Sequence, residues 1–593
     1  MTESIVIVEV FARCDGQKTK NIESPKFCPF LFFSFLYNGG IMQFRSKSSF
    51  QTLKTVPSGS ANKSTGFLLQ AGYIRQENAG VYNFLPLGLR VMRKIEQIVR
   101  EEMDAVGCEE ILMGSLVSKE SMDTTNRWDV DILFKVKGAN DADFALGFSH
   151  EEVATPLMIE FLRSYKQLPA CIYQFQTKFR NEKRAKSGLL RGREFKMKDA
   201  YSFHLTTEEF QEFFEAMRQA YIRVYERLGI GGITVPVFSD GGEFTPNDSI
   251  EFQTFTPIGE DIIFYDETNN AWYNREIAGS KAPNYKYEKD EKPLEKHTLE
   301  GITGVQALIK EFNIPIELST KALFYEKDDK IILVVVRSDY DVNELKLRKI
   351  AGSGWKPATP ENIKKFTKSE VGYAGLYNLD KGIAVYVDEA CEAMTNFETG
   401  GNETGVHITN CNWGRDIQKP TQFYDLKVAK ETDLNPNSGK EYRTEKASEV
   451  GNIFDLSQKY TEAFNLKITT ENGKTLHPYM GCYGIGISRT MGVIAEAMMS
   501  EKGLSWPENV SPYTHLIVVH GDHLEKAKTL ALSLEKEGKE VLIDERDAGF
   551  GMKMGDADLL GIPNVILLTD KTLEKGGYEL REGNQEEKIV HFT

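Results

Sequence analysis

The stretch from Lys178 to Phe203, KFRNEKRAKSGLLRGREFKMKDAYSF, constrains the fold of this chain more than any other segment. Lysine and arginine crowd its first part, in a protein whose formal net charge is −15. Apolar residues on both sides predict two strands joined by a basic loop. Such a loop suits a polyphosphate, because arginine forks meet phosphate oxygens two at a time. A solvated charged hairpin is the alternative. The residues whose strand spacing favours a binding site are Arg180, Glu182, Arg193 and Phe195.

Size and composition bound the architecture. A chain of 593 residues is too long for one hydrophobic core, so three to four domains are expected. Hydrophobic content of 41% and charged content of 27% are typical of globular proteins. No apolar run reaches the ~18–20 residues that a membrane helix needs, so no membrane is expected. The acidic net charge argues against nonspecific binding to DNA, whereas a local basic face could still bind RNA.

Cysteine usage points to a reducing compartment. The seven cysteines are an odd number, are scattered along the chain and form no C-x-x-C pair. Neither a disulfide framework nor a zinc ribbon is therefore predicted, and no metal site of that kind is expected. Reduced thiols favour a cytoplasmic location.

Residues 1–41 differ from the rest of the chain. They include a ten-residue aromatic run, CPFLFFSFLY, which is short even for a signal-peptide core. We expect either an upstream start codon, in which case they are not translated, or an unrelated extension. The alternative is an organellar presequence, which would place the protein in a matrix compartment.

The basic stretch also carries a family resemblance. F-R-x-E followed by R-x-R-E-F-x-M-K-D-A-Y-S-F resembles motif 2 of class II aminoacyl-tRNA synthetases, in the form found in prolyl enzymes of bacterial type. The resemblance extends from about Met42 to the end of the chain. It implies an α/β (α+β) protein: an antiparallel-sheet catalytic core, an inserted α/β editing domain and a C-terminal α/β anticodon-binding domain. The predicted boundaries are 1–41 for the extension, 42–281 and 419–506 for the two parts of the core, 282–418 for the inserted domain and 507–593 for the anticodon-binding domain.

A helix and a strand near residue 100 resemble motif 1, the dimer element of the class. Apolar residues from Leu89 to Val106 recur at three- and four-residue steps, which predicts an amphipathic helix that Gly107 ends. A strand is predicted at Glu110–Met113. The family has proline where this chain has Gly114. The resemblance implies a homodimer.

The segment FALGFSHEEVATPLM resembles the family's T-x-E loop, which holds the amino acid. By resemblance Glu151 takes the charged ring nitrogen of proline and Ser149 supplies a hydroxyl, in place of the usual threonine. A carboxylate is the natural partner for a secondary ammonium in a closed pocket. Spacing alone also fits a helix N-cap at Ser149, with Glu151 and Glu152 as acidic first-turn residues.

The chemistry implied for the basic loop joins a carboxylate to the α-phosphorus of ATP and releases pyrophosphate. Both reactants are anionic, so the site must neutralise charge and align them, and it needs no general base. By resemblance Arg180 bridges the α-phosphate and the carboxylate, and Glu182 reads the adenine amino group. Arg191 or Arg193 contacts the phosphates, and Phe195 lies against adenine. The chemistry also implies Mg²⁺ between the β- and γ-phosphates.

A second polar pair lies on the alternating segment from Asp248 to Asp266. Glu251 and Gln253 share one face at period two. The resemblance places the completion of the proline pocket near here, which assigns both residues to it. A polar strand face is the alternative for Gln253.

The inserted segment resembles the domain that removes mischarged alanine from the tRNA. Lys321 in TKALF, Asp388 in YVDEA and His407 in GVHITNCNWGRD match its signature. By resemblance Lys321 holds the tRNA terminus while Asp388 and His407 shape a pocket that excludes proline by size. An exposed lysine and a structural histidine are the alternatives.

MGCYGIGISRTMGVIAEAM resembles motif 3. By resemblance its glycines Gly481, Gly484 and Gly486 pass under a ligand, and Arg489 lies on the face of adenine opposite Phe195 and reaches the γ-phosphate. A Rossmann interpretation fails because Arg489 stands where glycine or alanine is needed. The G-x-x-x-x-G at 400–405 lacks the P-loop lysine and is rejected.

The C-terminal segment alternates strands and helices, which predicts an α/β layer. DERDAGFGMKMGDADLLGIP resembles the anticodon-binding domain of the Gly, His, Pro and Thr enzymes. Asp544, Arg546 and Lys553 are candidates for contacting RNA. A surface loop of mixed charge is the alternative for each.

Three functions remain open on the sequence. The resemblance favours an ATP-dependent enzyme that joins L-proline to tRNA(Pro), with removal of mischarged alanine by the inserted domain. A non-catalytic paralogue that binds RNA or protein is a second interpretation, opposed by the joint presence of Arg180, Glu182, Phe195 and Arg489. A threonyl enzyme is a third, although Cys171 and Cys482 lack the setting of its zinc ligands.

Overall fold

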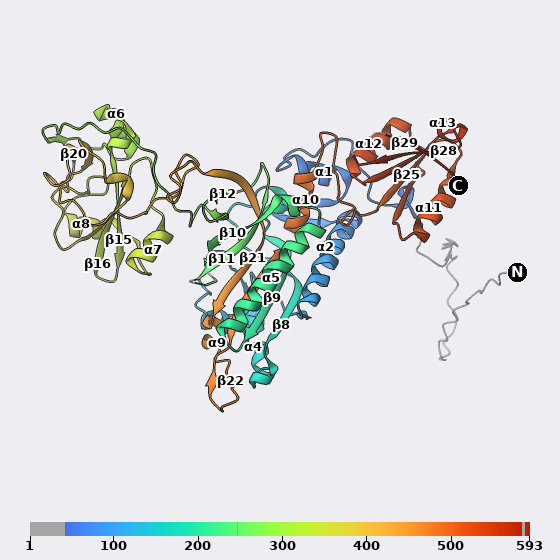
Figure 1. Ribbon diagram of the computed structural model, residues 1–593, viewed down its shortest axis with the longest axis horizontal. Coiled ribbons are helices and arrows are strands. Elements are labelled where there is room, and N and C mark those ends of the chain that lie inside the picture. Colours follow the sequence, from blue (N-terminus) through green and yellow to red (C-terminus); the bar gives the residue numbers. More distant parts are fainter. Residues whose placement is uncertain (1–41, 243, 246, 584–586, 593) are drawn as a thin grey trace.

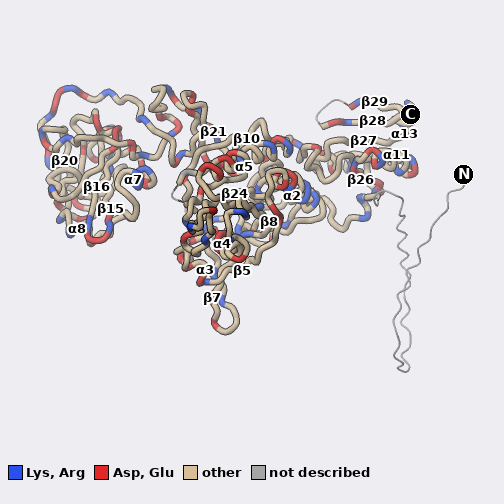
Figure 2. Tube along the Cα trace, turned by 60° about the horizontal axis from the view of Figure 1, so that its bottom comes forward, with Lys and Arg blue, Asp and Glu red and all other residues tan. Residues whose placement is uncertain are grey.

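The computed structural model describes residues 42–242, 244–245, 247–583 and 587–592, so the predicted extension at 1–41 lies outside the described residues. Figure 1 shows three lobes: the inserted domain at one side, the catalytic core in the centre and the C-terminal domain at the other side. In each lobe Lys and Arg are interspersed with Asp and Glu (Figure 2). No helix among the described residues is both long and apolar enough to cross a membrane.

A nine-stranded sheet forms the catalytic core. Its strand order is β11-β10-β13-β12-β21-β24-β9-β8-β4, and most neighbours are antiparallel. The strands are β4 (Glu109–Glu110), β8 (Ala170–Phe179), β9 (Glu194–His204), β10 (Thr234–Asp240), β11 (Asp248–Phe255), β12 (Asp261–Asp266), β13 (Ala271–Asn274), β21 (Arg443–Ser457) and β24 (Tyr479–Gly486). The antiparallel core sheet predicted from the resemblance is therefore present.

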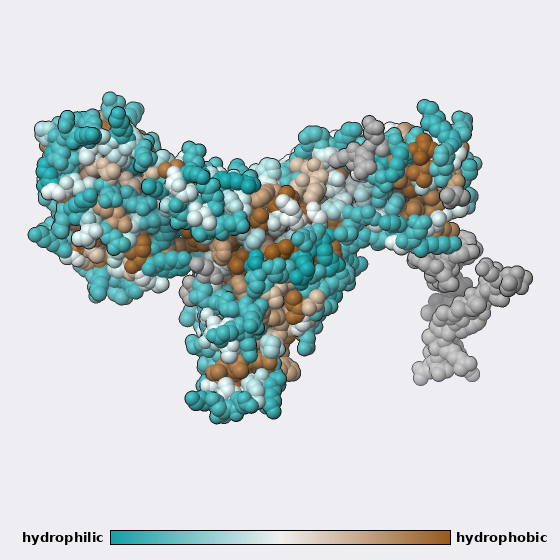
Figure 3. Space-filling view, in the orientation of Figure 1, coloured by the Kyte–Doolittle hydropathy of each residue, from teal (hydrophilic) through white to brown (hydrophobic). Residues whose placement is uncertain are grey.

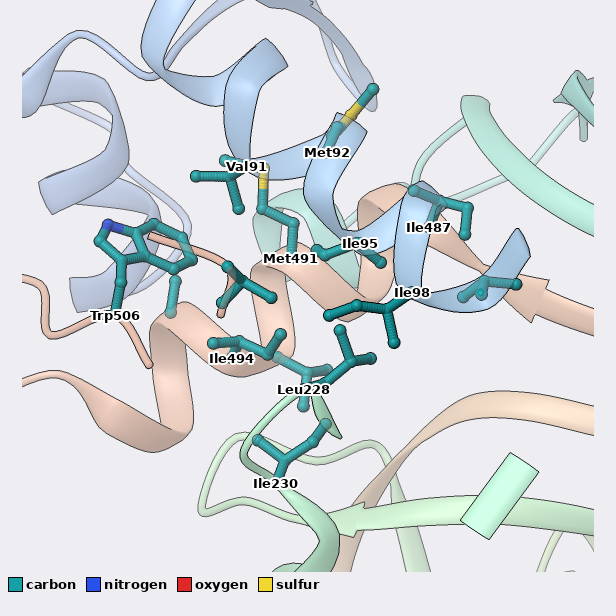
Figure 4. Close-up of a cluster of buried hydrophobic side chains, with 14 of the residues drawn as sticks. Val91, Met92, Ile95, Ile98, Leu228, Ile230, Ile487, Met491, Ile494 and Trp506 are labelled. Atoms are coloured by element: carbon teal, nitrogen blue, oxygen red, sulfur yellow. The ribbon is translucent and has the colours of Figure 1, made fainter. Parts of the chain in front are cut away.

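Three helices cover this sheet: α2 (Pro86–Ala105), α5 (Thr207–Arg227) and α10 (Ile487–Met498). Apolar side chains from α2 and α10 meet the turn after α5 in one buried cluster (Figure 4). Ile95, Met491 and Ile494 are fully buried there. Burial of such side chains supplies the main driving force that holds helix to sheet.

The predicted motif 1 helix is confirmed as α2. Pro86 occupies its first turn, where no amide hydrogen bond is lost. Gly107 adopts φ +83°, and Cys108 N–H donates to Met103 O, which closes the helix end. The strand that follows is shorter and earlier than the predicted Glu110–Met113. Only Glu109 and Glu110 pair with β8, because Met113 is held by side chains instead of by a backbone ladder.

Smaller elements complete the core. They are α1 (Lys63–Ala71), β2 (Ile74–Asn78), β3 (Val81–Phe84), β5 (Leu116–Ser118), α3 (Lys119–Thr124), β6 (Phe134–Lys137), β7 (Asp143–Leu146), α4 (Glu151–Ile159), α9 (Lys459–Ala463), β22 (Ile468–Thr469) and β23 (Thr475–Leu476). Strands β5, β7 and β6 form a separate three-stranded sheet just before α4.

The inserted domain has two sheets and hydrophobic cores of its own. One sheet has the order β17-β15-β16-β18 and the other β14-β20-β19. The elements are β14 (Glu295–Thr298), α6 (Val305–Phe312), β15 (Thr320–Lys327), β16 (Lys330–Arg337), α7 (Glu344–Ala351), β17 (Lys356–Pro357), α8 (Pro360–Thr367), β18 (Ala384–Val387), β19 (Phe397–Gly400) and β20 (Val406–Cys411). The mixture of helices and strands agrees with the α/β character expected of the inserted domain.

The chain leaves the core and returns to it at one place. Lys281 and Leu434 exchange two backbone hydrogen bonds, so the two connections run side by side. The predicted return at residue 418 is too early. Leu426 belongs to a core of the inserted domain, and the buried Lys427 pairs with Asp388 of that domain. The inserted domain therefore extends to about residue 430.

The C-terminal domain is a six-stranded sheet between helices. Its order is β1-β26-β25-β27-β28-β29, parallel in the first four strands. The elements are β25 (His515–Val519), α11 (Leu524–Lys536), β26 (Val541–Asp544), α12 (Phe550–Leu560), β27 (Asn564–Leu568), α13 (Asp570–Glu574), β28 (Gly577–Glu582) and β29 (Lys588–His591). The predicted α/β layer is confirmed. The hairpin β28–β29 was not predicted.

Residues 42–53 were assigned to the catalytic core, but they join the C-terminal domain. Strand β1 (Gln43–Phe44) pairs in parallel with β26. Thr52 Oγ1 donates to Asp556 Oδ1 at 2.8 Å, and Arg45 is 2% exposed. The N-terminal segment therefore ties the two domains together, which no local pattern in the sequence indicates.

Candidate active site

Three central strands bring the predicted motifs together. β9 pairs with β8 along its whole length and with β24 on its other side, so Tyr479 lies opposite His204. At the far end Lys196 N–H donates to Ser488 Oγ at 3.1 Å, which ties the end of the basic loop to the start of α10. Motifs 2 and 3 are thus neighbours in space.

The basic loop is pinned rather than free. Arg193 N–H donates to Gly80 O at 2.8 Å, and its guanidinium donates to Glu182 O at 3.0 Å and Ala79 O at 3.1 Å. Arg191 holds the Glu182 carboxylate through two bonds, at 2.8 and 3.0 Å. Arg193 is therefore engaged in shaping the loop, whereas Arg191 faces the cavity described below.

Two arginines face a common space beside this loop. The Arg180 guanidinium lies over the Phe195 ring at 5.2 Å, and its Nε is buried without a hydrogen-bond partner among the described residues. Arg489 Nη1 donates to Glu449 Oε2 at 2.8 Å. Burial, and then the nearby charge of Arg489, lower the pKa of Arg180. Two cations this close, one with a free donor, are suited to an anion between them.

A cavity of about 230 Å³ opens at this point. It is lined by Glu182, Leu190, Arg191, Glu260, Asp261, Ser448, Glu449 and Arg489. Arginines and carboxylates therefore alternate on its wall. This set is suited to a phosphate chain that carries a divalent cation, because the arginines meet phosphate oxygens and the carboxylates meet the metal.

Glu151 lies at the base of a second site and has a buried cationic partner. Arg127 Nη1 is 3.0 Å from Glu151 Oε2, 3.0 Å from Glu152 Oε1 and 2.8 Å from the Tyr460 hydroxyl. Ser149 Oγ donates to Glu151 Oε1 at 2.8 Å. The N-cap interpretation of Ser149 is thus replaced by a contact between side chains, and the N-cap position is His150.

One cation serves two carboxyl groups here. Burial opposes ionisation of both, but Arg127 and the hydrogen bonds from Ser149 and Cys482 outweigh it at Glu151 and lower its pKa. At Glu152 the effect of burial exceeds that of Arg127, the negative charge of Glu151 acts in the same direction as burial, and the pKa is raised. Glu151 is therefore the ionised member of the pair.

Sequence reasoning missed Arg127. Its guanidinium lies between the rings of Phe148 and Phe244, at 4.3 and 4.8 Å from their centroids. It stands in a loop after α3, where no periodicity or motif marks it. The cue would have been a requirement for charge balance, because two adjacent buried acids need a cation.

Glu251 and Gln253 share a face, as predicted, but they belong to a different network. Gln253 Nε2 donates to Glu251 Oε2 and to Asp261 Oδ2, both at 2.8 Å. Burial and the charge of Glu449 raise the pKa of Glu251 to about 8. Among the described residues no hydrogen bond or ion pair joins Glu251 to Glu151. The structure thus places this pair beside the cavity wall.

The glycines of the third motif are explained partly by packing. A Cβ at Gly481 would lie 2.2 Å from the Tyr483 hydroxyl, so protein and not ligand demands glycine there. A Cβ at Gly486 would lie 3.2 Å from Arg489 Cβ. Gly486 lies immediately before α10, and its lack of a side chain leaves room for Arg489 in the first turn of that helix.

The three residues predicted in the inserted domain have separate surroundings. Lys321 Nζ donates to Tyr340 O at 2.7 Å and pairs with Asp341 at 2.6 Å. Asp388 is fully buried and accepts from Ala390 N–H and Leu426 N–H. Asp388 thus fastens the returning chain.

His407 has a partner that the sequence did not suggest. Its Nδ1 is 3.0 Å from Glu398 Oε1, and its Nε2 is buried without a partner among the described residues. Ser319, which stands two residues before Lys321, donates from its Oγ to the other oxygen of Glu398 at 2.7 Å. The Glu398–His407 pair therefore leaves one buried imidazole nitrogen without a partner among the described residues.

The three residues predicted to contact RNA form an internal network. Arg546 donates to both oxygens of Asp544 and to Asp556. Asp544 and Lys553 are 2% and 3% exposed, and Lys553 Nζ donates to Val519 O at 2.6 Å. Asp544 and Lys553 thus shape the loop from inside the domain.

Within the part of the chain that the structure describes, no group of three or more His, Cys, Asp or Glu side chains is arranged to hold a metal ion. Cys171 and Cys482 are buried thiols, and Cys482 Sγ donates to Glu151 Oε1 at 3.1 Å.

Comparisons with known proteins agree with this architecture. The family model for the tRNA synthetase class II core domain (G, H, P, S and T) matches residues 134–498, and the model for the anticodon binding domain matches residues 514–592. The proline–tRNA ligase of Bacillus cytotoxicus is 39% identical over 89% of this chain and 94% of its own length. That of Bacillus mycoides is 38% identical over the same shares.

Solved structures show the same fold. The prolyl-tRNA synthetase of Cryptosporidium parvum, complexed with halofuginone and AMPPNP, aligns with a TM-score of 0.54 over 91% of this chain and 77% of that chain, at 12% identity. The same enzyme complexed with L-proline and AMP also aligns with a TM-score of 0.54.

The antiparallel sheet, the pinned basic loop and the strand that delivers Arg489 define the catalytic core of a class II aminoacyl-tRNA synthetase. A C-terminal anticodon-binding domain accompanies it. Within that class, the chain belongs to the proline–tRNA ligase family.

Removing the buried cation should destabilise the core in a pH-dependent way. We predict that Arg127→Met lowers the free energy of unfolding by about 3–5 kcal/mol at pH 7, because two buried carboxyl groups lose their partner. In the variant the folded-state pKa of Glu151 and Glu152 lies above the unfolded value. The two carboxyl groups therefore cost little below about pH 4.3, and stability falls as pH rises through the folded-state pKa. Urea unfolding at pH 5 and pH 8 measures this.

The control is Arg218→Met, which removes an ion pair of two partly exposed side chains, 27% and 54% accessible. Such a pair contributes about 0–1 kcal/mol, so its urea midpoint should stay near that of the parent. Equal midpoints for the two variants at pH 7 would contradict the role given to Arg127.

Proposed function

We propose that the chain activates L-proline with ATP and transfers it to the 3′ end of tRNA(Pro). The observation that carries the proposal is that Arg191 and Arg489 line one cavity. The buried Arg180 lies close enough to Arg489 and to the carboxylate of Glu151 for both charges to act on it. Membership of the proline–tRNA ligase family supports the choice of amino acid.

The residues divide the work between charge and position. In the first step the carboxylate oxygen of proline attacks the α-phosphorus of ATP, and pyrophosphate leaves. Arg180 offers a free Nε to the α-phosphate and the carboxylate, and Arg489 faces the outer phosphates. In the second step a hydroxyl of the terminal ribose of the tRNA attacks the carbonyl carbon, and AMP leaves.

Glu151 fits the ring nitrogen of proline. Its two oxygens accept from Ser149, Cys482 and Arg127, while an ionised carboxylate can accept about four bonds. One acceptor position is therefore left for a secondary ammonium. Arg127 keeps Glu151 ionised and fixed in orientation, so that the charge of the substrate meets an opposite charge.

The carboxylates of the cavity wall fit Mg²⁺. Glu449 and Asp261 are the residues that would hold it, since Mg²⁺ binds one or two carboxylates together with substrate phosphates instead of a dedicated protein cage. When bound, it would neutralise charge on the β- and γ-phosphates.

The test is amino-acid-dependent exchange of pyrophosphate into ATP, measured with each of the twenty amino acids. We expect exchange with proline. Arg180→Ala should lower it at least about 100-fold, as loss of one preorganised donor does elsewhere. Lys183→Ala is the matched control, because its exposed side chain only pairs with Asp131. Exchange with no amino acid would favour a non-catalytic paralogue, and exchange with threonine alone a threonyl enzyme.

We also propose that the inserted domain hydrolyses Ala-tRNA(Pro). The free Nε2 of His407, oriented by Glu398 and close to the ring of Tyr373 at 5.3 Å, can accept a proton from an attacking water. Lys321 follows Ser319 and Thr320, which both bond Glu398, and its ammonium group would hold the tRNA terminus. Separate hydrophobic cores suit a second site that works apart from the first.

Lys321→Ala should leave proline-dependent exchange intact and raise the amount of stable Ala-tRNA(Pro) about 10-fold, because one charge-assisted contact to RNA is lost. Lys327→Ala on the same strand is the control, since Lys327 Nζ only donates to Ser353 O on the surface. Hydrolysis of Ala-tRNA at the parent's rate in Lys321→Ala would remove the assignment.

The C-terminal domain is the proposed anticodon-binding part. The family model that matches it supports this role. Asp544, Arg546 and Lys553 act there by holding the loop after β26 in shape, with Arg546 the most exposed of the three side chains, at 16% accessible.

A homodimer is proposed on the basis of an exposed apolar edge. β4 is an edge strand, and the segment after it exposes Leu112 by 74% and Leu116 by 58%. Phe161, after α4, is 57% exposed. It precedes Leu162, which belongs to the hydrophobic cluster that also contains Met113. Figure 3 shows hydrophobic surface on the lower part of the central lobe, where α4 lies in Figure 1. Such a patch marks an interaction surface.

Charges on this edge should separate the subunits. The double substitution of Leu112 and Leu116 by Asp is expected to shift the mass in sedimentation equilibrium from dimer to monomer, because buried like charges oppose association. Leu323→Asp, on an exposed residue of the inserted domain, should leave the mass unchanged. A parent protein that sediments as a monomer would overturn the proposal.

A further inference from the structure

His150 stands between the two residues assigned to the proline pocket, yet its ring bonds elsewhere. The side chain is fully buried. Its Nδ1 lies 2.6 Å from Lys178 Nζ, and its Nε2 lies 3.1 Å from Gly114 O. The family resemblance gives no role to this position, and the preceding sections leave it unused.

The two partners decide the protonation of the ring. An ammonium group can only donate and a carbonyl can only accept. Nδ1 therefore accepts from Lys178, and Nε2–H donates to Gly114 O. If the ring were doubly protonated, its Nδ1–H would point at the ammonium group of Lys178, and two donors would face each other. Burial, and then the charge of Lys178, lower the pKa of His150 to about 4, which agrees with the neutral form.

The main chain of His150 is fixed by the same network. Lys178 Nζ is 2.7 Å from Asp199 Oδ1, so the lysine keeps a carboxylate partner. The other oxygen of Asp199 accepts from the Tyr201 hydroxyl at 2.8 Å and from Gln174 Nε2 at 3.0 Å. The Tyr201 hydroxyl in turn accepts from His150 N–H at 2.9 Å. Ring and peptide are thus both held by β8 and β9.

The far end of the network is the edge segment after β4. Met113 N–H donates to Gln174 Oε1 at 2.9 Å, and Gln176 Nε2 donates to Met113 O at 2.7 Å. The carbonyl of Gly114 is the next acceptor along this segment. His150 therefore connects the exposed edge, proposed above as a subunit contact, with the loop that carries Ser149 and Glu151.

We propose that His150 is a positioning residue for amino-acid binding: clamped as the neutral Nε2–H imidazole between Lys178 and the Gly114 carbonyl, it sets the orientation of Ser149 and Glu151. The inference rests on the proposed function, because it assumes that these two residues bind proline. His150 itself touches neither substrate.

The position of the clamp predicts which kinetic constant changes. Ser149 and Glu151 share peptide units with His150, so loss of the clamp lets this stretch of backbone move, displaces their side chains and weakens binding of the amino acid. The nucleotide cavity is lined by other residues, so loss of the clamp should leave the binding of ATP unchanged. A residue that only stabilised the fold would affect both substrates alike.

Two amides test the clamp. Asn at position 150 keeps a polar group opposite Lys178 but is too short to reach Gly114 O, whereas Gln reaches it. In proline-dependent pyrophosphate exchange with the full chain, we expect His150→Asn to raise the KM for proline about 10- to 100-fold, the effect of losing a hydrogen bond in a charged network. The KM for ATP should stay within about twofold, and His150→Gln should recover most of the loss.

His204→Leu is the matched control. His204 is 1% exposed on β9, burial lowers its pKa to about 4, and neither ring nitrogen has a hydrogen-bond partner among the described residues. Its removal should leave the KM for proline unchanged. If His150→Asn matches the parent, or if it raises both KM values equally, the proposal is overturned. A parent without exchange would refute the proposed function itself.

Discussion

The ladder of backbone hydrogen bonds between β9 and β24 is the interaction on which the rest of the structure depends. It pairs Tyr479 with His204 and Gly486 with Met197, across a sequence separation that spans the inserted domain. Both strands lie inside the sheet, so each has a hydrogen-bonded strand on both sides. Because register fixes which side chains share a face, this one ladder sets Arg489 beside the basic loop. The site is a consequence of strand pairing.

Buried charge is the second constraint. Arg127, Lys178 and Asp199 are each almost fully buried, and each has an opposite charge within 3.0 Å. Burying such pairs seldom adds net stability, since the cost of removing charges from water is large. Their arrangement serves orientation: Arg127 and the Ser149 hydroxyl keep Glu151 ionised and hold it in one position. Stability for this arrangement comes from the hydrophobic cluster under α2 and α10.

The sequence predicted the elements whose signals are local. The amphipathic α2 follows from its periodicity and its glycine stop, the strand pair around the basic loop follows from its apolar flanks, and all are found. Features that depend on distant partners were missed. β1 joins β26 across almost the whole chain, and β4 is short because Gln174 and Gln176 hold Met113 in place of a ladder. Neither contact leaves a mark in the local sequence.

The candidate site shows the same division. Residue types for anion binding could be named because phosphate chemistry restricts the choice to a few side chains. Arg191 and Arg489 line one cavity, and the charge of Arg489 acts on the nearby Arg180. Their supporting partners could not be named. Arg127 and Glu449 balance charges that meet only in the folded protein. Asp544 and Lys553 are of residue types that contact RNA, although the fold buries them. A charged residue in a sequence reveals its chemistry but not its exposure.

The two connections at Lys281 and Leu434 explain how a second domain can be carried without disturbing the first. Strands β13 and β21 lie on either side of this crossing, and two reciprocal backbone hydrogen bonds close it. The two ends of the inserted segment are held together, so the insertion constrains the core sheet no more than a short loop between β13 and β21 would. Because the inserted domain buries its own cores, its Glu398–His407 pair is assembled independently of the nucleotide cavity. The inserted domain and the catalytic core therefore keep separate interiors, joined through the paired connections.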